Sequence, residues 1–351
     1  MGEKILMKGN EAIGEAAIRA GCRYYFGYPI TPQSELTAYM AKKLLKMENA
    51  SFVQAESEIA AINMVYGSAS TGVRAMTSSS SPGISLKQEG ISYIACSEIP
   101  CVIVNMQRGG PGLGDIQPAQ GDYFQAVKGG GHGDYHLIVL APSSVQELVD
   151  LTMDAFDLAD KYRNPAMILG DGLLGQMMEA IEFNEKPKVD LPDKTGWTLT
   201  GCKGREQRYV VSFDLDPNIL EKWNLNIEKK YKLLKENETR YEAINLENAD
   251  MVIVAYGTVA RIAKTVVQLA KKEGLCIGLI RPITLYPFPE KIIAQTAEKV
   301  KKFLTVEMSL GQMVEDVKLA VNGKAEVNFY GRAGGVIPSP QEILNKAKSY
   351  M

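Results

Sequence analysis

Hydrophobic positions in the first half of the chain follow two different spacings. Apolar runs of a few residues predict strands at 24–27, 51–54, 74–77, 101–105, 137–141 and 166–170. In the stretches between these runs, apolar residues recur every three or four positions, as in the segment 36–47, and this period predicts helices. Short apolar strands separated by helices are typical of a parallel sheet that is covered on both faces.

The pattern changes twice in the second half of the chain. Residues 186–245 are polar at first and then strongly charged, which predicts a connecting arm. The charged stretch 221–244 fits either a solvated helix or a surface for a partner chain. Strand and helix patterns resume with ADMVIVAYG and TVARIAKTVVQLAKKEG, so we expect two α/β domains, 1–185 and 246–351, joined by this arm.

Composition and charge narrow the function classes. The chain has 351 residues with 39 basic and 41 acidic side chains, a balance that gives no support to nucleic-acid binding. No apolar run reaches the roughly 18 residues that a membrane span requires, and the first ten residues lack a signal-peptide core, so we expect a cytoplasmic chain. The five cysteines form no C-x-x-C pair, which excludes the usual zinc and iron–sulfur spacings.

The segment FGYPITPQSE, residues 26–35, stiffens the junction between a strand and a helix. Pro32 favours the first position of a helix, so Thr31 is predicted as its N-cap, with Pro29 fixing the preceding turn. A helix N-terminus beside a hydroxyl group suits a carboxylate or a phosphate. A stiff cap without any ligand explains the same residues.

Glu58 stands in the first turn of the predicted helix that follows QAES. A carboxylate at that position stabilises the helix dipole, which needs no further function. Ile59, Ile62, Val65 and Tyr66 indicate that much of this helix is buried. A carboxyl group in such surroundings can give or take a proton, so both interpretations stay open.

Two further segments carry candidate chemistry. Residues 77–90, TSSSSPGISLKQEG, read as a turn that either admits a ligand to the backbone or merely reverses the chain. Arg108 ends a predicted strand and leads into a glycine-rich loop, RGGPGLG. An arginine can bind a carboxylate through two hydrogen bonds and glycines suit a closing loop, although a surface salt bridge is the alternative.

Two familiar cofactor motifs are incomplete. Gly170-Asp171-Gly172 begins like the magnesium motif of thiamin diphosphate enzymes, but Asn184 comes too early and Asn218 too late to complete it, so we interpret it as a turn. The segment VAYGTVA at 254–260 is not a G-x-G-x-x-G fingerprint. A stand-alone nicotinamide dehydrogenase therefore has weak support.

Taken together, these segments resemble the α subunit of 2-oxoacid:ferredoxin oxidoreductases over nearly the whole chain. The resemblance rests on Y-P-I-T-P, on Q-A-E-S-E with Glu58 nine residues before Gly67, on R-G-G-P-G-L-G, and on V-A-Y-G-T, R-P-I-T-L-Y-P-F-P and V-E-M-S-L-G-Q. The segments G-L-G-D-I-Q-P-A-Q-G-D-Y and G-G-G-H-G-D-Y are most like those of the branched-chain (2-oxoisovalerate) members, with the 2-oxoglutarate members second. The resemblance implies a parallel-sheet thiamin diphosphate pyrimidine-binding-type domain followed by a smaller transketolase C-terminal-like domain.

The resemblance also implies cofactors and partners. Thiamin diphosphate would be shared with a β subunit that holds the diphosphate and its Mg²⁺, in keeping with the incomplete motif at 170–172. Iron–sulfur (4Fe-4S) clusters would lie on a ferredoxin-like subunit that passes electrons to ferredoxin, and coenzyme A would be the co-substrate. The assembly implied is a dimer of heteromers, and no metal ligand is expected in this chain.

Residue roles follow from the resemblance. Glu58 matches the glutamate that hydrogen-bonds the pyrimidine N1′ and favours the imino tautomer, and its spacing to Gly67 selects it over Glu56. Thr31 and Arg108 match positions that bind the substrate carboxylate. Tyr28, Pro29 and Ser81 are expected, with Glu58, to bind the cofactor. A non-catalytic scaffold subunit is the competing hypothesis, and the presence of Glu58, Thr31 and Arg108 together speaks against it.

Overall fold

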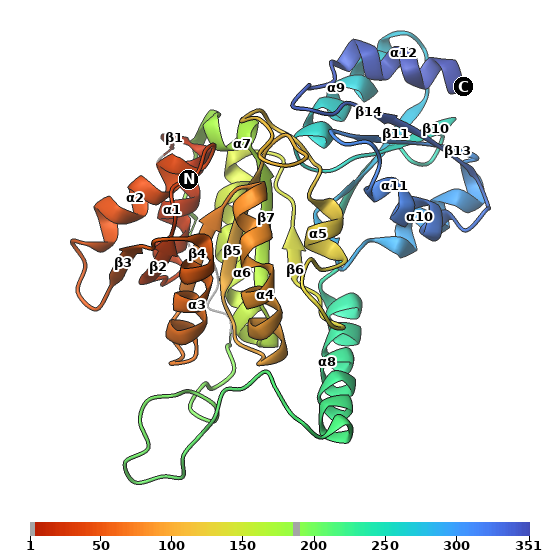
Figure 1. Ribbon diagram of the computed structural model, residues 1–351. Helices are drawn as coiled ribbons and strands as arrows, with labels where there is room; N and C mark the ends of the chain where they lie inside the picture. Colours follow the sequence, from red (N-terminus) through yellow and green to blue (C-terminus); the bar gives the residue numbers. More distant parts are fainter. Residues whose placement is uncertain (1–3, 185–189) are drawn as a thin grey trace.

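The computed structural model describes residues 4–184 and 190–351, which form two α/β lobes (Figure 1). All six strands predicted in the first half are present. They are β2 (Tyr24–Gly27), β3 (Ser51–Gln54), β4 (Ala75–Ser79), β5 (Val102–Gln107), β6 (Ile138–Leu140) and β7 (Ala166–Asp171). They run parallel in a sheet of order β12-β6-β7-β5-β4-β2-β3, in which β12 (Thr284–Tyr286) is an antiparallel edge strand. Residues from the second half of the chain therefore complete the first sheet.

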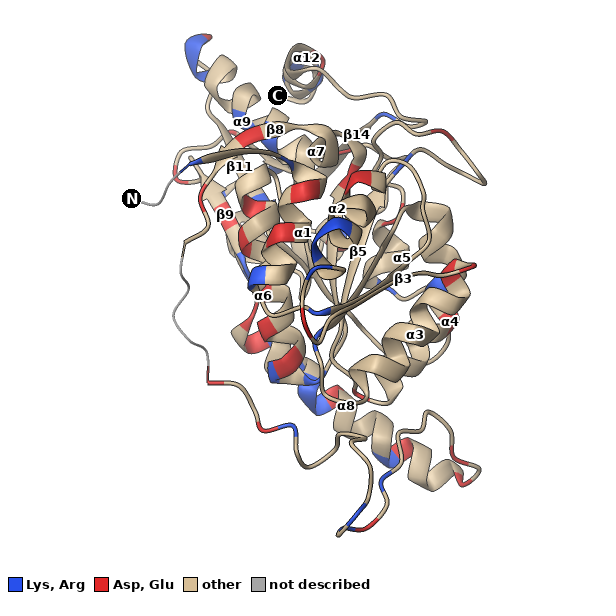
Figure 2. Cartoon of the chain, turned by 90° about the vertical axis from the view of Figure 1, so that its left-hand side faces the viewer, with Lys and Arg blue, Asp and Glu red and all other residues tan. Residues whose placement is uncertain are grey.

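Helices cover both faces of the first sheet, as the sequence predicts (Figures 1 and 2). Helices α1 (Gly9–Arg19), α2 (Ser34–Leu44) and α6 (Val145–Tyr162) lie on one face, and α3 (Glu58–Ala69) and α4 (Ser81–Cys96) pack together on the other. The short helix α5 (Tyr123–Val127) follows the loop after β5, and the short helix α7 (Gly172–Gln176) begins directly after β7. Strands β4, β5, β6 and β7 are buried along their whole length, because both faces are covered.

The second lobe is a smaller α/β unit. Its sheet has the order β14-β13-β10-β11-β9, with bounds β9 (Tyr241–Ile244), β10 (Met251–Val254), β11 (Ile277–Pro282), β13 (Lys302–Glu307) and β14 (Glu326–Gly331). Its helices are α9 (Gly257–Lys272), α10 (Glu290–Lys299), α11 (Met313–Val321) and α12 (Pro340–Tyr350). A separate two-stranded ribbon joins β1 (Ile5–Lys8) to β8 (Met178–Ile181) in the first lobe. The predicted fold class is confirmed.

The charged arm contains one long helix, α8 (Pro217–Asn237), which lies along the first lobe (Figure 1). Tyr231 and Leu234 of this helix are buried. The ring of His136 stacks on Tyr286 with 4.1 Å between ring centroids, and Tyr231 closes on it edge-on at 5.2 Å. Burial lowers the pKa of His136. One side of α8 is thus part of the core, and His136 serves packing.

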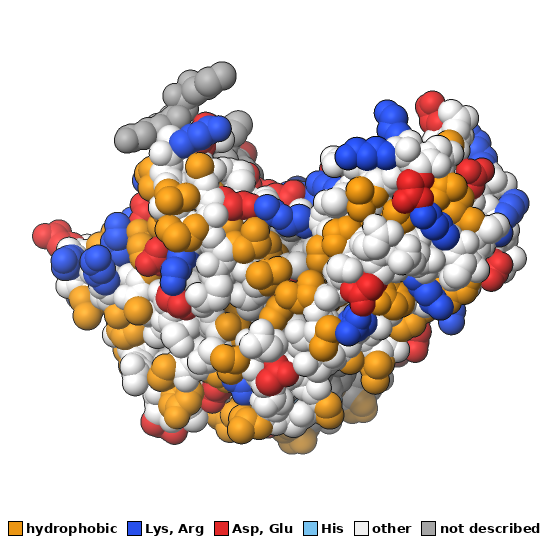
Figure 3. Space-filling view, turned by 90° about the horizontal axis from the view of Figure 1, so that it is seen from above, with side chains coloured by type: hydrophobic (Ala, Val, Ile, Leu, Met, Phe, Trp, Pro, Cys, Tyr) orange, Lys and Arg blue, Asp and Glu red, His pale blue; other side chains and the backbone are white. Residues whose placement is uncertain are grey.

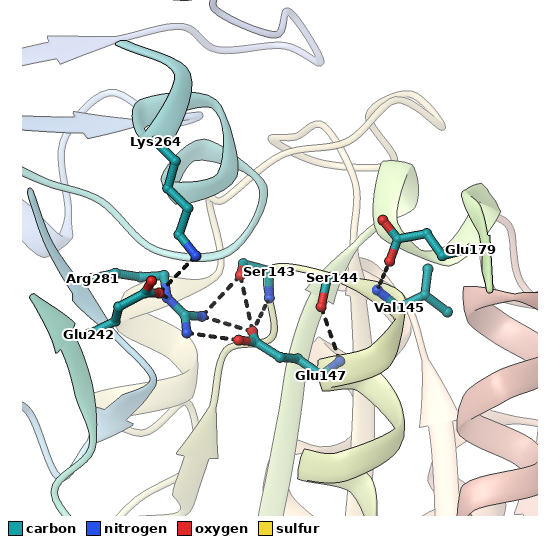
Figure 4. Close-up of polar contacts among 8 residues, drawn as sticks. All are labelled: Ser143, Ser144, Val145, Glu147, Glu179, Glu242, Lys264 and Arg281. Atoms are coloured by element: carbon teal, nitrogen blue, oxygen red, sulfur yellow. Dashed lines mark hydrogen bonds and ion pairs between the residues drawn. The ribbon is translucent and has the colours of Figure 1, made fainter. Parts of the chain in front are cut away.

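A buried arginine joins the two lobes (Figure 4). Arg281 on β11 is 2% exposed and binds Glu147 of α6 through both terminal nitrogens, each at 2.8 Å. Its Nε donates to Glu242 of β9, also at 2.8 Å. Lys264 adds an ion pair to Glu242, whose pKa is lowered by these cations although burial opposes the shift. The guanidinium group therefore connects carboxylates from both lobes.

Several of the family-like segments meet at the junction between the lobes. The Gln120 side chain donates to the carbonyl of Tyr256 and accepts from the amide of Met308, both at 3.0 Å. Glu307 is fully buried and accepts the amides of Met313 and Val314 at the start of α11, at 3.1 and 3.0 Å. These residues hold the lobes and the helix in place, which explains the segments V-A-Y-G-T and V-E-M-S-L-G-Q structurally.

Charged residues of both signs are interspersed on the face that carries α1, α2 and α6 (Figure 2). Among residues 4–184 and 190–351, no helix combines the length and the apolar character needed to cross a membrane.

Candidate functional site

Four predicted site residues lie where neighbouring strands end. Strands β3, β2, β4 and β5 are adjacent and parallel, so their carboxyl ends share one edge of the sheet. Glu58, Thr31, Ser81 and Arg108 follow these strands in that order. Ligands of open α/β sheets bind at this edge. The fold therefore gathers residues that are 77 positions apart in the sequence, as the contact between Thr31 and Arg108 shows.

The prediction that Thr31 caps a helix is wrong. Helix α2 begins at Ser34, and its N-cap is Gln33, whose side chain makes no capping hydrogen bond. The Gln33 amide donates to the Ile30 carbonyl at 3.2 Å, so Thr31 and Pro32 are the central residues of a turn that precedes the helix. Thr31 is exposed at the head of this turn, beside the exposed Tyr28 and Pro29.

Buried polar groups hold the turn rigid. Asn10 donates from Nδ2 to the Pro32 carbonyl at 2.8 Å, and Arg108 donates from Nη1 to the Thr31 carbonyl at 3.0 Å. The side chain of Gln33 accepts from Ser78 Oγ at 2.5 Å and is fully buried. Hydrogen bonds from distant elements therefore fix the position of Thr31, in addition to the flanking prolines.

Arg108 is 8% exposed and binds the loop that follows it. Its Nη2 donates to the Leu113 carbonyl at 2.8 Å, while its Nε has no hydrogen-bond partner among the described residues. The surface salt bridge considered from the sequence is absent from the described part of the chain. The loop closes tightly, since Gly114 has φ +64° and a Cβ there would lie 1.7 Å from the Gly109 carbonyl oxygen.

Ser81 connects Arg108 to an acid that the sequence interpretation missed. The Ser81 hydroxyl donates to Asp122 at 2.6 Å, and it accepts from the backbone amide of Arg108 at 3.0 Å. Burial raises the pKa of Asp122, against the hydrogen bonds from Ser81 and Asn105. The expected turn at 77–90 is mostly helical, because α4 starts at Ser81. Asp122, in the quoted segment QGDY, had no spacing that marked it.

Glu58 is 6% exposed, so its expected buried position is confirmed. It is the first residue of α3, whose N-cap Ser57 accepts the amide of Ala60 at 3.2 Å. Glu56 is exposed and accepts the Ser57 hydroxyl at 2.8 Å. No hydrogen bond from residues 4–184 or 190–351 reaches the Glu58 carboxylate. The structure thus separates the two acids of Q-A-E-S-E by their surroundings.

Unpartnered polar atoms surround this site. In the described chain, Ser79 Oγ, Ser80 Oγ and Arg108 Nε are buried without a hydrogen-bond partner. Buried polar atoms are almost always satisfied in native proteins, so these three indicate a group that binds here and supplies partners. A buried carboxyl group beside free hydroxyls fits the ring nitrogens of an aminopyrimidine. Within the described ranges, no group of three or more His, Cys, Asp or Glu could hold a metal ion.

Asp171 does not lie in a turn as predicted, because it is the last residue of β7 and α7 begins at the next residue. Its side chain caps α7 by accepting the amides of Leu173 and Leu174 at 3.0 and 3.2 Å. Both amides bind Oδ1, so this oxygen is committed to the strand-to-helix junction.

A cleft of about 360 Å³ opens between the lobes. It is lined by Ser81, Arg108 and Asp122 from the first lobe and by Met308 and Gln312 from the second. The surface is hollowed between the two lobes in the view from above (Figure 3). Thr31 and Glu58 are not in this lining. The structure thus brings Thr31 and Ser81 each into contact with Arg108 and leaves Glu58 at a neighbouring strand end.

The fold and site define an α/β enzyme subunit of the thiamin diphosphate-binding class. Residues 15–196 match the family described as pyruvate flavodoxin/ferredoxin oxidoreductase, thiamine diP-bdg, and residues 249–343 match pyruvate:ferredoxin oxidoreductase core domain II. The chain belongs to the 2-oxoacid:ferredoxin oxidoreductase family, whose members depend on thiamin diphosphate.

Curated relatives extend over nearly the whole chain. The ketoisovalerate oxidoreductase subunit VorB of Methanothermobacter marburgensis is 52% identical and covers 98% of this chain and 97% of its own. The 2-oxoglutarate synthase subunit KorA of the same organism is 38% identical, with 99% of both chains covered.

Solved structures give the same fold. The 2-oxoglutarate:ferredoxin oxidoreductase from Magnetococcus marinus, with 2-oxoglutarate, coenzyme A and succinyl-CoA bound, matches with a TM-score of 0.84 and 26% identity. The match covers 99% of this chain and 65% of that one. A split-gene transketolase in an inactive β4 tetramer matches at a TM-score of 0.58 and 14% identity, a likeness of fold alone.

Proposed function

We propose that this chain is the α-type subunit of an enzyme that oxidatively decarboxylates a branched-chain 2-oxoacid, 2-oxoisovalerate, to an acyl-CoA and CO₂. Coenzyme A is the co-substrate and ferredoxin takes the electrons. The higher identity to the ketoisovalerate subunit than to the 2-oxoglutarate subunit supports this substrate.

The chemistry of the cleft favours the same substrate. Arg108 is the one Lys or Arg among the described residues that line the cleft. A second carboxylate, as in 2-oxoglutarate, calls for a second cation, whereas a branched apolar tail does not. The Arg108 loop also presents Leu113 and Ile116, which are 80% and 57% exposed. Faster turnover of 2-oxoglutarate than of 2-oxoisovalerate by the assembled enzyme would reverse this assignment.

The observation that carries the proposal is the buried carboxyl group of Glu58 at the strand edge, beside unpartnered hydroxyls. Thiamin diphosphate, when bound, supplies the electron sink for decarboxylation. Glu58 would hold a proton at the pyrimidine ring nitrogen, while Arg108 and the turn at Thr31 orient the substrate carboxylate. Tyr28, Pro29 and Ser81 would contact the cofactor, with Asp122 keeping Ser81 in place.

Partner subunits complete the proposed enzyme. A β subunit would bind the diphosphate and Mg²⁺, because Asp171 is occupied by helix capping. An iron–sulfur subunit would carry the electrons to ferredoxin, and the whole would form a dimer of heteromers. The apolar side chains Ile59, Met64 and Leu86 are exposed on α3 and α4 and offer a surface for the β subunit.

The test is Glu58→Gln in the complex assembled with its partner subunits. Amide replacement keeps the shape and removes the titratable proton, so hydrogen–deuterium exchange at the thiamin C2 is expected to slow by about 100-fold or more. Glu56→Gln, two residues away and exposed, is the matched control and should exchange normally. Normal C2 exchange in Glu58→Gln, with cofactor bound, would reject the role given to Glu58.

A further inference from the structure

Lys87 is fully buried on α4, in the layer beneath the candidate site. Its Nζ donates one hydrogen bond, to Thr77 Oγ1 on β4 at 2.8 Å. An ammonium group has three donors, so a single hydroxyl partner leaves it poorly satisfied. A lysine in such a place is costly, and neither packing nor capping explains it.

Lys87 and Glu58 lie near the same face of strand β4 and the same face of helix α4. Thr77 and Ser79 are two residues apart on β4 and share one face of that strand. Gly83 and Lys87 are four residues apart on α4 and share one face of that helix. A Cβ at Gly83 would lie 2.1 Å from Ser79 Oγ and 2.6 Å from Glu58 Oε1. The Glu58 carboxylate therefore rests against α4 one turn before Lys87.

Lys87 and Glu58 also interact electrostatically. Burial lowers the pKa of Lys87 to about 7, and the charge of Glu58 opposes that shift. Glu58 on α3 is the one charged group that acts on Lys87 among the described residues, since β4 contributes only hydroxyls. The charge of Glu58 therefore acts on the buried Lys87 amine across the contact between α3 and α4.

We propose that Lys87 is the positioning residue that sets the proton occupancy of Glu58. A protonated Lys87 stabilises the ionised Glu58 carboxylate, and a neutral Lys87 leaves the carboxyl group free to keep its proton. The proposal rests on the role given above to Glu58, because Lys87 acts on the cofactor only through that residue. The hydroxyl of Thr77 holds the Lys87 amine on the face of α4 that Glu58 meets.

The test uses the full chain without cofactor, so that it does not depend on turnover. Glutamate carboxyl groups are labelled with carbon-13, the Glu58 signal is assigned by its loss in Glu58→Gln, and its titration is followed by NMR. In Lys87→Met, loss of a nearby cation should move the Glu58 titration to higher pH by about one unit. Glu89→Gln changes an exposed charge on the same helix and should leave the titration in place.

A merely structural lysine gives a different result. Lys87 binds a proton on unfolding between about pH 7 and its usual pKa of 10.5, so it makes stability rise with pH in that window. Lys87→Met should remove this rise and stabilise the chain at neutral pH. If stability changes in this way while the Glu58 titration coincides with that of the native chain, the proposal is overturned.

A second variant keeps the test decisive. Lys87→Arg retains a positive charge, so the Glu58 titration should stay close to the native one, and a shift equal to that of Lys87→Met would contradict the proposal. Failure of the proposed function has a separate signature, namely normal thiamin C2 exchange in Glu58→Gln. The outcome of the Glu58 titration by NMR does not depend on the outcome of the C2 exchange experiment, so the two failures can be distinguished.

Discussion

At the scale of single residues, Arg108 has two tasks that can be told apart. Two of its nitrogens bind the carbonyls of Thr31 and Leu113, and its Nε is unpartnered in the described chain. The bound carbonyls shape the loop, and the free Nε is available to a carboxylate. A buried cation with one nitrogen free is better suited to binding an anion than to a surface ion pair.

Arg108→Ala is therefore expected to raise the KM for the 2-oxoacid by about 10- to 100-fold, the value of a hydrogen bond to a charged group. The KM for coenzyme A should change little, and steady-state assays of the assembled enzyme with a viologen acceptor would measure both. Arg108→Lys keeps the charge but lacks the planar guanidinium group with its two parallel donors. Its KM for the 2-oxoacid should therefore lie between those of the native enzyme and of Arg108→Ala. Equal effects on both substrates would speak against carboxylate binding.

Residue roles were predictable only where the chemistry depends on residue type and neighbours. Q-A-E-S-E offers two acids, and burial at the start of a helix separates Glu58 from the exposed Glu56. The sequence pattern did not mark Asp122 or Lys87 as candidate site residues. The residues they interact with, Ser81 and Glu58, lie 41 and 29 positions away in the sequence. Their importance comes from contacts between elements.

At the scale of elements, the packing of α3 against α4 depends on Gly83. Gly83→Ala places a methyl group against Ser79 and Glu58, both buried in the described structure. Overpacking of this kind costs about 1–3 kcal/mol of unfolding free energy and should displace the Glu58 carboxylate. We expect weaker cofactor binding by the assembled enzyme, measured by calorimetry, together with reduced stability.

Gly67→Ala is the matched control for that substitution. Gly67 lies in α3 with open space at its Cβ position, and alanine stabilises a helix relative to glycine by up to about 1 kcal/mol. Cofactor affinity should be unchanged in this variant. If Gly83→Ala binds cofactor like the native chain, Glu58 does not depend on this contact.

The start of α2 shows how far element prediction reaches. A Thr-Pro pair ahead of an amphipathic pattern is a good signal for a helix start, and a helix is present. Its first residue is Ser34, because Ile30 to Gln33 form a turn of their own. Asn10 and Arg108, from α1 and the end of β5, stabilise that turn. Local pattern located the helix, and distant side chains set where it begins.

At the scale of the whole molecule, the Arg281 cluster determines how the lobes sit on each other (Figure 4). Arg281→Met leaves the Glu147 carboxylate, whose side chain is 29% exposed, without its bidentate partner. Because this carboxylate keeps some contact with water, the expected cost is about 1.5–3 kcal/mol, the value of hydrogen bonds to a charged group. Chemical denaturation of the full chain should show a loss of that order.

Lys264→Met tests whether position in the cluster matters more than charge. Lys264 pairs with Glu242 at the rim, where its side chain is 35% exposed, so its loss should cost about 0–1 kcal/mol. If Arg281→Met and Lys264→Met lose equal stability, burial does not determine how much each ion pair of the cluster stabilises the protein. The cleft that contains Arg108 and Met308 lies between the same lobes, so Arg281→Met should also impair substrate binding.

The sequence by itself determined the layered α/β class, the six parallel strands of the first lobe and the chemistry available at their ends. It could do so because periodicity and turn residues are local properties, and because parallel strands bring their carboxyl ends to one edge. Tertiary structure alone decided that β12 completes the first sheet, that Arg281 joins the lobes, and that Lys87 stands beneath Glu58. These features depend on burial and on contacts between residues far apart in the chain, and the charge and hydrogen bonding of a side chain change with such contacts.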